Sequence, residues 1–112
     1  MTDPVDAVER VLGESDDADD ALRETVRILA SEPGLVWAGI AFTEEGALTP
    51  GPEAGSPDPV RRLAVPVVWE GTTVGELLAD GEVDGDILDR IAALLPAHVL
   101  LGWDTGGETW KP

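Results

Sequence analysis

Residues 63–77 read LAVPVVWEGTTVGEL, and this stretch predicts the centre of the fold. Residues 61–70 and 72–80 are rich in branched and aromatic side chains, which favour β-strands. Glu70 and Gly71 form a tight-turn signal between the two runs, so the stretch predicts an antiparallel hairpin. Pro66 lies inside the first run, and since proline cannot donate a ladder hydrogen bond, we expect it on an edge strand or at a bulge.

Patterns on both sides of the hairpin predict an α+β domain. We expect a short helix that Asp3 caps and Pro4 begins, and a second helix over residues 17–31 that is capped by the acidic break at residues 14–17. A strand over 35–43 and a brief strand near 47–49 are expected to follow. Residues 50–59 hold four prolines and two glycines, which predicts a loop. The last helix is expected from about residue 84 to 101, kinked or ended by Pro96. This order predicts an antiparallel sheet of about four strands with helices packed on one face.

The hairpin and the strand before it resemble the GAF domain family. Residues 36–42, VWAGIAF, are similar to the first core strand of that family. Residues 63–77 resemble its pattern of apolar-Val-Pro-apolar, turn, apolar-Gly-apolar-Leu, and an acidic turn and a closing helix around residues 87–92 follow in the same order. The resemblance spans residues 18–98 and implies a GAF- or PAS-like fold with a sensory or regulatory role.

Two departures from the family limit what the resemblance implies. A full GAF domain has a long ligand-covering segment between its second strand and the hairpin, where this chain has only residues 50–59. Some GAF proteins reduce free methionine sulfoxide and others attach a chromophore, but both kinds of chemistry use cysteine, and this chain has none. We therefore predict that the chain carries no catalytic residue, is not an enzyme and needs no cofactor.

The charge of the chain excludes several classes of partner. Its 23 acidic residues against 7 Lys and Arg give a formal net charge of −16. Such a surface repels phosphate backbones and anionic lipids, so we expect no nucleic acid and no membrane as partner. The acidic, lysine-poor surface is typical of a halophile's cytoplasmic protein, although a GC-rich genome also favours arginine over lysine. The sequence shows no signal peptide, and we expect a cytoplasmic location.

The acidic run DGEVDGDI at residues 80–87 partly matches a calcium-binding EF-hand loop. The twelfth loop position needs a bidentate carboxylate, but Ile91 stands there. We therefore predict no metal site, and a strand-to-helix turn in which Asp84 or Asp86 caps the last helix.

Three residues are candidates for contact with a small ligand. Trp37 and Trp69 could line a shallow cleft. His98 is the only histidine and could bind a metal or act as a general base. A lone imidazole on an apolar helix face is more often a core or interface residue.

Four residues are candidates for an interface. Ile91 and Leu95 belong to an apolar helix face over residues 87–99 that is wider than one sheet face needs, which predicts a homodimer. Trp103 and Trp110 face each other in a hairpin pattern centred on a Gly-Gly pair. They either fold back over the core or offer an aromatic patch to a protein partner.

The sequence thus predicts one GAF-like domain over residues 1–112. It comprises an acidic N-terminal helix and break (1–16), a core (17–101) and a tryptophan-containing tail (102–112). The favoured function is a non-enzymatic regulatory or binding module that mediates dimerisation or protein interaction in signalling. The alternatives are a small-molecule sensor with a reduced pocket and, less favoured, a metal- or histidine-dependent enzyme.

Overall fold

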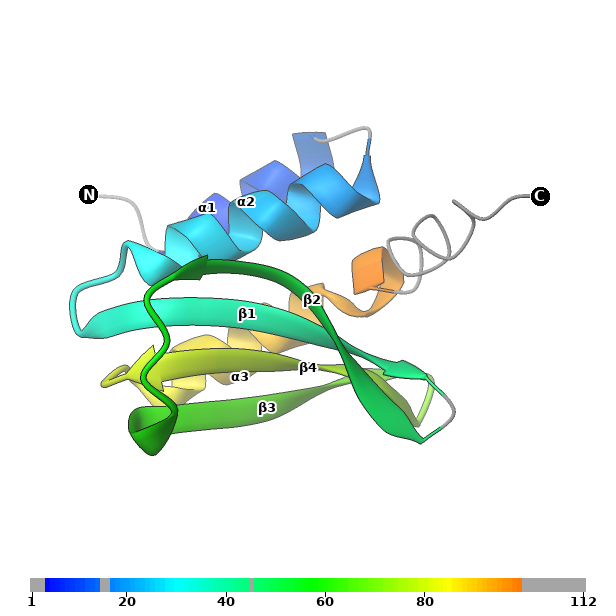
Figure 1. Ribbon diagram of the computed structural model, residues 1–112. Helices are drawn as coiled ribbons and strands as arrows, with labels where there is room; N and C mark the ends of the chain where they lie inside the picture. The colour runs from blue at the N-terminus through cyan, green and yellow to red at the C-terminus, as the bar shows by residue number, and fades with distance from the viewer. Residues whose placement is uncertain (1–3, 15–16, 45, 100–112) are drawn as a thin grey trace.

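The predicted hairpin forms one side of a four-stranded antiparallel sheet in the computed structural model, which describes residues 4–14, 17–44 and 46–99 (Figure 1). Glu70 and Gly71 join its strands with φ angles of 47° and 83°. Two successive residues with positive φ are typical of the two-residue turns whose twist matches that of paired strands. The elements are α1 (Pro4–Glu14), α2 (Ala18–Ala30), β1 (Leu35–Glu44), β2 (Ala47–Gly55), η1 (Pro59–Arg61), β3 (Arg62–Trp69), β4 (Thr72–Gly81) and α3 (Gly85–Leu94).

The strands lie in the order β2-β1-β4-β3, so β2 and β3 form the two edges. Pro66 lies on the edge strand β3, as predicted, where a missing N–H can face away from the ladder. The expected fold class, an α+β domain with a four-stranded antiparallel sheet, is confirmed.

The loop predicted over residues 50–59 was wrong for its first half. Residues 50–55 continue β2, and Pro50 pairs with Ala41 of β1 beyond a register shift. Prolines are tolerated here because an edge strand has one side without ladder hydrogen bonds. Proline and glycine content predicted a loop, but it could not show that this segment lies against a neighbouring strand.

Helices α2 and α3 pack against one face of the sheet, which we call the inner face; α2 contacts β1 and β2, and α3 contacts β3 and β4. Both helices begin at the predicted acidic caps: the Asp17 side chain accepts a hydrogen bond from the backbone N–H of Asp19, and Asp84 accepts one from Asp86. Helix α3 ends at Leu94, earlier than the expected residue 101, since the Pro96 ring cannot continue a regular helix. A further helical turn covers residues 96–99.

The core lies between these helices and the inner face of the sheet. Its fully buried apolar side chains come from the three helices, from the segment that follows α3, and from β1, β3 and β4: Val8, Leu22, Val26, Leu29, Ile40, Val67, Leu77, Leu88, Ile91, Leu95 and Val99. Ile91 and Leu95 were predicted to lie at an interface, but both are completely buried within the chain. The apolar face of α3 is wide because it packs against both the sheet and α1. These two side chains are thus core residues and offer no surface to a partner.

Within the described ranges, no helix combines the length and the apolar character that crossing a bilayer requires.

Candidate functional site

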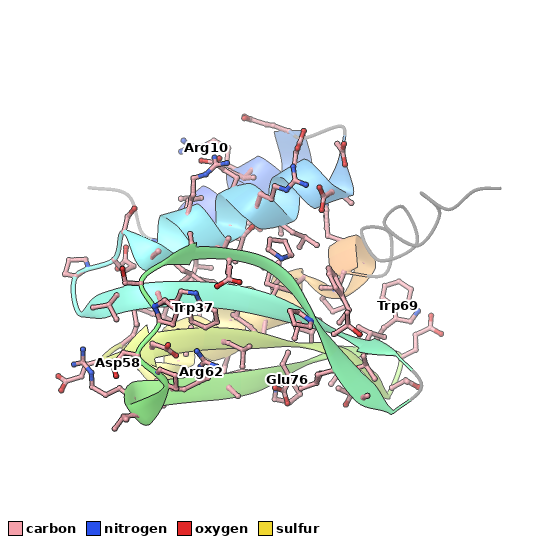
Figure 2. The ribbon with its side chains drawn as sticks, in the orientation of Figure 1. Arg10, Trp37, Asp58, Arg62, Trp69 and Glu76 are labelled. Atoms are coloured by element: carbon pink, nitrogen blue, oxygen red, sulfur yellow. The ribbon has the colours of Figure 1, made fainter. Side chains whose placement is uncertain are left out.

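The opposite face of the sheet, which we call the outer face, carries a row of three side chains across three strands. Asp80 of β4 is the register partner of Trp37 on β1 and of Arg62 on β3. Residues paired across antiparallel strands point to the same face, so the three side chains lie side by side. Figure 2 shows Trp37 and Arg62 together near one end of the sheet.

Asp80 and Arg62 form an ion pair with two hydrogen bonds. The Arg62 Nε and Nη2 atoms donate to Asp80 Oδ1 and Oδ2 over 2.7 and 2.9 Å. The Asp80 side chain is completely buried, whereas that of Arg62 remains one-third exposed (33%). The hydrogen bonds from Arg62 lower the pKa of the Asp80 carboxyl, and a backbone hydrogen bond adds to this effect, although burial opposes it. Asp80 is therefore held in its charged form.

That backbone hydrogen bond comes from the segment that connects β2 to β3, residues 56–61, which we call the strap. The Asp58 N–H donates to Asp80 Oδ2 over 2.6 Å. The Ser56 N–H donates to the Val36 carbonyl over 2.8 Å. Gly55 begins the crossing with a φ of 97°, and a Cβ at this position would lie 2.2 Å from the same carbonyl oxygen. The strap is thus attached to both central strands of the sheet.

Trp37 lies between the ion pair and β2. The Arg62 guanidinium carbon is 4.4 Å from the centre of the indole ring, within the range of a cation–π contact. The indole Nε1 donates to Glu53 Oε1 on β2 over 2.8 Å. The far edge of the ring lies above Gly39, where a Cβ would approach Trp37 Cη2 to 2.6 Å. Glycine at position 39 therefore lets the indole lie along the strand.

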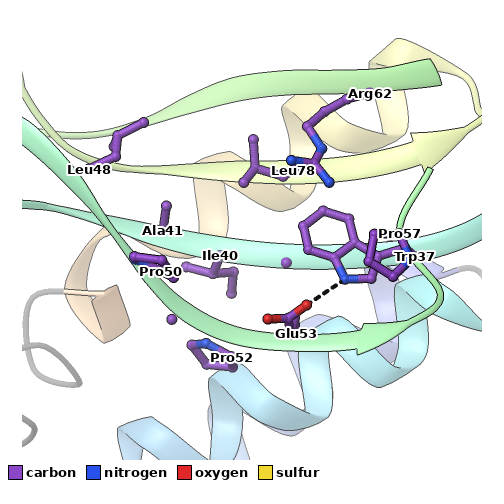
Figure 3. A pocket seen from close by; sticks show the side chains of 12 residues that line it. Trp37, Ile40, Ala41, Leu48, Pro50, Pro52, Glu53, Pro57, Arg62 and Leu78 are labelled. Carbon is purple, nitrogen blue, oxygen red and sulfur yellow. Dashed lines mark hydrogen bonds between the residues drawn. The ribbon is translucent and has the colours of Figure 1, made fainter. Parts of the chain in front are cut away.

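A pocket opens beside Trp37, with a volume of about 350 Å³ (Figure 3). Gly39 and Ala41 form part of the floor, and they leave room that larger side chains would fill. Proline and aliphatic side chains make most of the remaining wall, and Glu53 and Arg62 contribute the charged groups. The lining residues are Trp37, Gly39, Ile40, Ala41, Leu48, Pro50, Gly51, Pro52, Glu53, Pro57, Arg62 and Leu78.

A second hollow lies at the β3 edge, between that strand and α3. It is more open than the first, with a volume of about 440 Å³, and Val65, Pro66, Val68 and Pro96 are among its lining residues. Its charged lining residue is Asp89.

The structure separates the three predicted ligand contacts. Trp37 lines the pocket, but Trp69 lies at the opposite end of the sheet and is 40% exposed (Figure 2). His98 lies on the helical side, with Nε2 3.2 Å from the Leu12 carbonyl oxygen and a buried Nδ1 that lacks a partner in the described part of the chain. Among those residues, no group of three or more His, Asp or Glu side chains is arranged to hold a metal ion. Trp103 and Trp110 lie outside the described residues.

The sequence analysis missed Arg62, Asp80 and Glu53 as site residues. Asp80 was considered only as part of an EF-hand-like run, and Arg62 only as the second residue of a predicted strand. The hydrogen-bonded pairs are separated by 18 residues for Arg62 and Asp80 and 16 for Trp37 and Glu53. Without the strand order, no spacing in the sequence points to these contacts.

Comparison with solved structures identifies the architecture. The GAF domain of a phosphoenolpyruvate-protein phosphotransferase from Acinetobacter matches with a TM-score of 0.75 and 13% identity, over 95% of this chain and 98% of that chain. The chain has a GAF-like fold. A putative GAF sensor protein from Burkholderia vietnamiensis matches this GAF-like chain with a TM-score of 0.67 and 17% identity, over 96% and 90% of the two chains. No protein-family model and no curated protein matches the sequence.

The GAF-like fold is also that of enzymes. A free methionine-R-sulfoxide reductase from Neisseria meningitidis, solved in complex with its substrate, matches with a TM-score of 0.73 and 16% identity, over 90% of this chain and 89% of that one. Reductases of the same kind from other organisms also match. The prediction that this chain is not an enzyme was therefore wrong: absence of cysteine was taken to exclude catalysis, whereas the structural neighbours point to a catalytic role as one use of this fold. What these comparisons show for this chain is its GAF-like fold.

Proposed function

We propose that this GAF-like domain binds a small molecule in the outer-face pocket beside Trp37 and thereby acts as a sensor. The observation that carries the proposal is the pocket itself. Its volume of about 350 Å³ lies within the range of about 300–1,000 Å³ that small-molecule sites occupy. Its wall is mainly apolar with a few placed polar groups, which is the usual composition of such sites.

A series of contacts connects the pocket to the exposed strap. Trp37 contacts Arg62, Arg62 is bound to Asp80, and Asp80 accepts the hydrogen bond from the strap at Asp58. A ligand that displaces the indole would change the Arg62 contact and, through Asp80, the attachment of the strap. The strap is exposed over most of its length, so a partner could detect this change.

The test begins with the intact protein, purified under high salt and denatured immediately before mass spectrometry of small molecules. A stoichiometric compound is expected from the unsubstituted chain. Ala41→Leu, which places a larger side chain on the pocket floor, should remove it, while Ala93→Leu, at an exposed position of α3 outside the pocket lining, should retain it. Retention of the compound by a folded Ala41→Leu variant would contradict the proposal.

The same protein is assayed for reduction of free methionine sulfoxide, the substrate class that the names of the similar reductases indicate. Turnover that is lost in Ala41→Leu would make the pocket an active site and not a sensory one. Binding without turnover supports the sensor.

A second candidate, the protein-interaction module or homodimer of the sequence analysis, is favoured by the β3 edge. This strand is unpaired on one side within the described sheet, and Leu63, Val68 and Trp69 expose 39%, 44% and 40% of their surface. An unpaired strand with exposed apolar side chains can add a strand from another chain. Light scattering during size-exclusion chromatography in high salt tests this: a dimer that Val68→Lys converts to a monomer supports it, and a monomer at all concentrations contradicts the homodimer.

A further inference from the structure

Acidic groups outnumber basic groups in and around the pocket beside Trp37. Its basic residue, Arg62, is matched one-to-one by the buried carboxylate of Asp80. The carboxylate of Glu53 lies in the same lining and forms no ion pair within the described ranges. One of its oxygen atoms accepts the Trp37 N–H, and the other is available for a ligand. Counted together with Asp80, which is buried beside Arg62, the charged groups of the pocket therefore sum to a net negative charge.

Glu76 adds a second carboxylate next to the pocket. It is the register partner of Ala41, which forms part of the pocket floor, so the two side chains project from the same face about 5 Å apart at their Cβ atoms. Glu76 is only partly exposed, and it has no basic partner among the residues that the structure describes. Figure 2 labels Glu76 nearer the middle of the β3–β4 hairpin than Arg62.

The protein itself shows that a cation is stabilised at this place. The Arg62 guanidinium lies over the Trp37 ring, and its pKa is raised first by the hydrogen bond with Asp80 and further by the charges of Asp80 and Glu53, although burial lowers it. The Glu53 carboxylate thus contributes a negative charge at the pocket in addition to that of Asp80, which is already paired with Arg62. The formal net charge of −16 acts in the same direction, because it lowers the local concentration of anions and raises that of cations.

We infer that the pocket binds an organic cation, an ammonium or amidinium group on an apolar body, with Glu53 and Glu76 as its counter-charges. The inference rests on the proposed function, because it names the chemical class of the ligand for the same pocket. The apolar body lies against Leu48, Pro50 and Leu78, and the charged group lies between the two carboxylates. An anionic ligand would meet these carboxylates and would have to compete with Asp80 for Arg62.

The experiment is a ligand-observed NMR screen of the intact chain with matched triplets of small aromatic and aliphatic compounds. Each triplet has one body and three end groups, for example phenethylamine, phenethyl alcohol and 3-phenylpropionate. The cation of a binding triplet is expected to bind most tightly. Its affinity should fall as KCl is raised, since added ions screen the attraction.

Two variants identify the counter-charges. Glu53→Gln keeps an oxygen that can accept the Trp37 N–H but removes the charge. Glu76→Gln removes the charge next to the pocket and keeps the size of the side chain. Each should weaken the cation by about two- to fivefold, the range for partly exposed ion pairs, without changing the neutral compound. Glu70→Gln, at the exposed turn between β3 and β4, is the matched control and should leave affinity unchanged.

The outcomes separate the inference from the proposed function. Cation preference that is lost in the two variants supports both. Equal binding of all three end groups, or preference for the anion, overturns the inference while the pocket remains a ligand site. If no triplet binds and the purified protein carries no compound, the proposed function fails, and the inference fails with it.

Discussion

Arg62 stacks on Trp37 with its guanidinium carbon 4.4 Å from the ring centre. Arg62 is the first residue of β3, and Trp37 is the third residue of β1. Between the two lies β4, whose Asp80 holds the guanidinium by two hydrogen bonds. The contact thus fixes the indole, the end of β4 and the start of β3 relative to one another. It also forms one wall of the proposed ligand pocket.

Gly39→Ala should disturb Trp37 directly. The added Cβ would lie 2.6 Å from the indole, so the ring must rotate or the strand must shift. We expect a loss of about 1–3 kcal/mol in the free energy of unfolding, as for overpacked cores, together with a changed tryptophan fluorescence spectrum. Urea unfolding followed by fluorescence and by circular dichroism measures both.

Gly13→Ala is the matched control for that substitution. Gly13 lies in α1, and a Cβ there would meet no atom within 4 Å. Alanine should stabilise the helix by about 0.4–1 kcal/mol, because it restricts the unfolded chain and favours helix. A loss of stability in this variant, or none in Gly39→Ala, would contradict the described positions of the two glycines.

Asp80 should make stability depend on pH in the acidic range. Its pKa in the folded protein is lowered, chiefly by the hydrogen bonds from Arg62. A carboxyl with a lowered folded pKa stabilises the protein above its unfolded pKa of about 4, and this contribution is lost as the pH falls through the folded pKa. The unsubstituted chain should therefore exceed Asp80→Asn in stability at pH 7, and the difference should shrink below about pH 4.

The unsubstituted chain must be compared with Asp80→Asn, because protonation of the remaining carboxylates has the opposite effect on the free energy of unfolding. Protonation of surface carboxylates reduces the repulsion that comes with a net charge of −16. Urea unfolding of both proteins at pH 7, 5, 4 and 3 isolates the Asp80 contribution. A difference that is constant over this range would show that Asp80 is not specifically charged and paired in the folded state.

Salt should stabilise this protein. At 0.1 M ionic strength charges interact over about 10 Å, and at 1 M over about 3 Å, so added KCl screens the repulsion among the acidic residues. We expect the free energy of unfolding to rise by more than about 1 kcal/mol, the upper value for one exposed ion pair. Denaturant titrations at 0.1 and 2 M KCl measure this rise.

A variant with fewer charges tests the cause of that effect. Glu9, Glu70 and Asp89 are exposed, and replacing them with Gln, Gln and Asn changes the net charge from −16 to −13. The triple variant should gain less stability from KCl than the unsubstituted chain. An equal gain in both proteins would mean that salt acts through the core and not through surface charge.

Asp84→Ala should weaken the start of α3. The Asp84 side chain accepts the Asp86 N–H over 3.0 Å, and losing such a cap costs about 1 kcal/mol. Asp84→Ser, which can cap in the same way, should recover most of the loss in thermal unfolding. Failure of serine to recover it would point to a role of Asp84 other than capping.

Local features of the sequence determined much of the fold. The Glu70-Gly71 turn, the branched residues on each side of it and the caps at Asp17 and Asp84 all act between near neighbours in the chain, so their effects can be predicted without knowing the tertiary structure. The periodic apolar residues of α2 and α3 likewise predicted which helix faces are buried. The same periodicity could not distinguish core from interface, and Ile91 and Leu95 proved to be core.

The tertiary structure alone decided the site. Residues 50–55 became a strand because β1 offers hydrogen bonds along its free side, and this strand brings Glu53 to the Trp37 indole. Asp80 became a buried partner of Arg62 because β4 lies between β1 and β3 in the sheet. Strand order is set by packing of the whole chain, and a contact between distant residues exists only once that order is formed. The acidic composition predicted how the surface responds to salt, while the pocket and its charge came from which strands lie side by side.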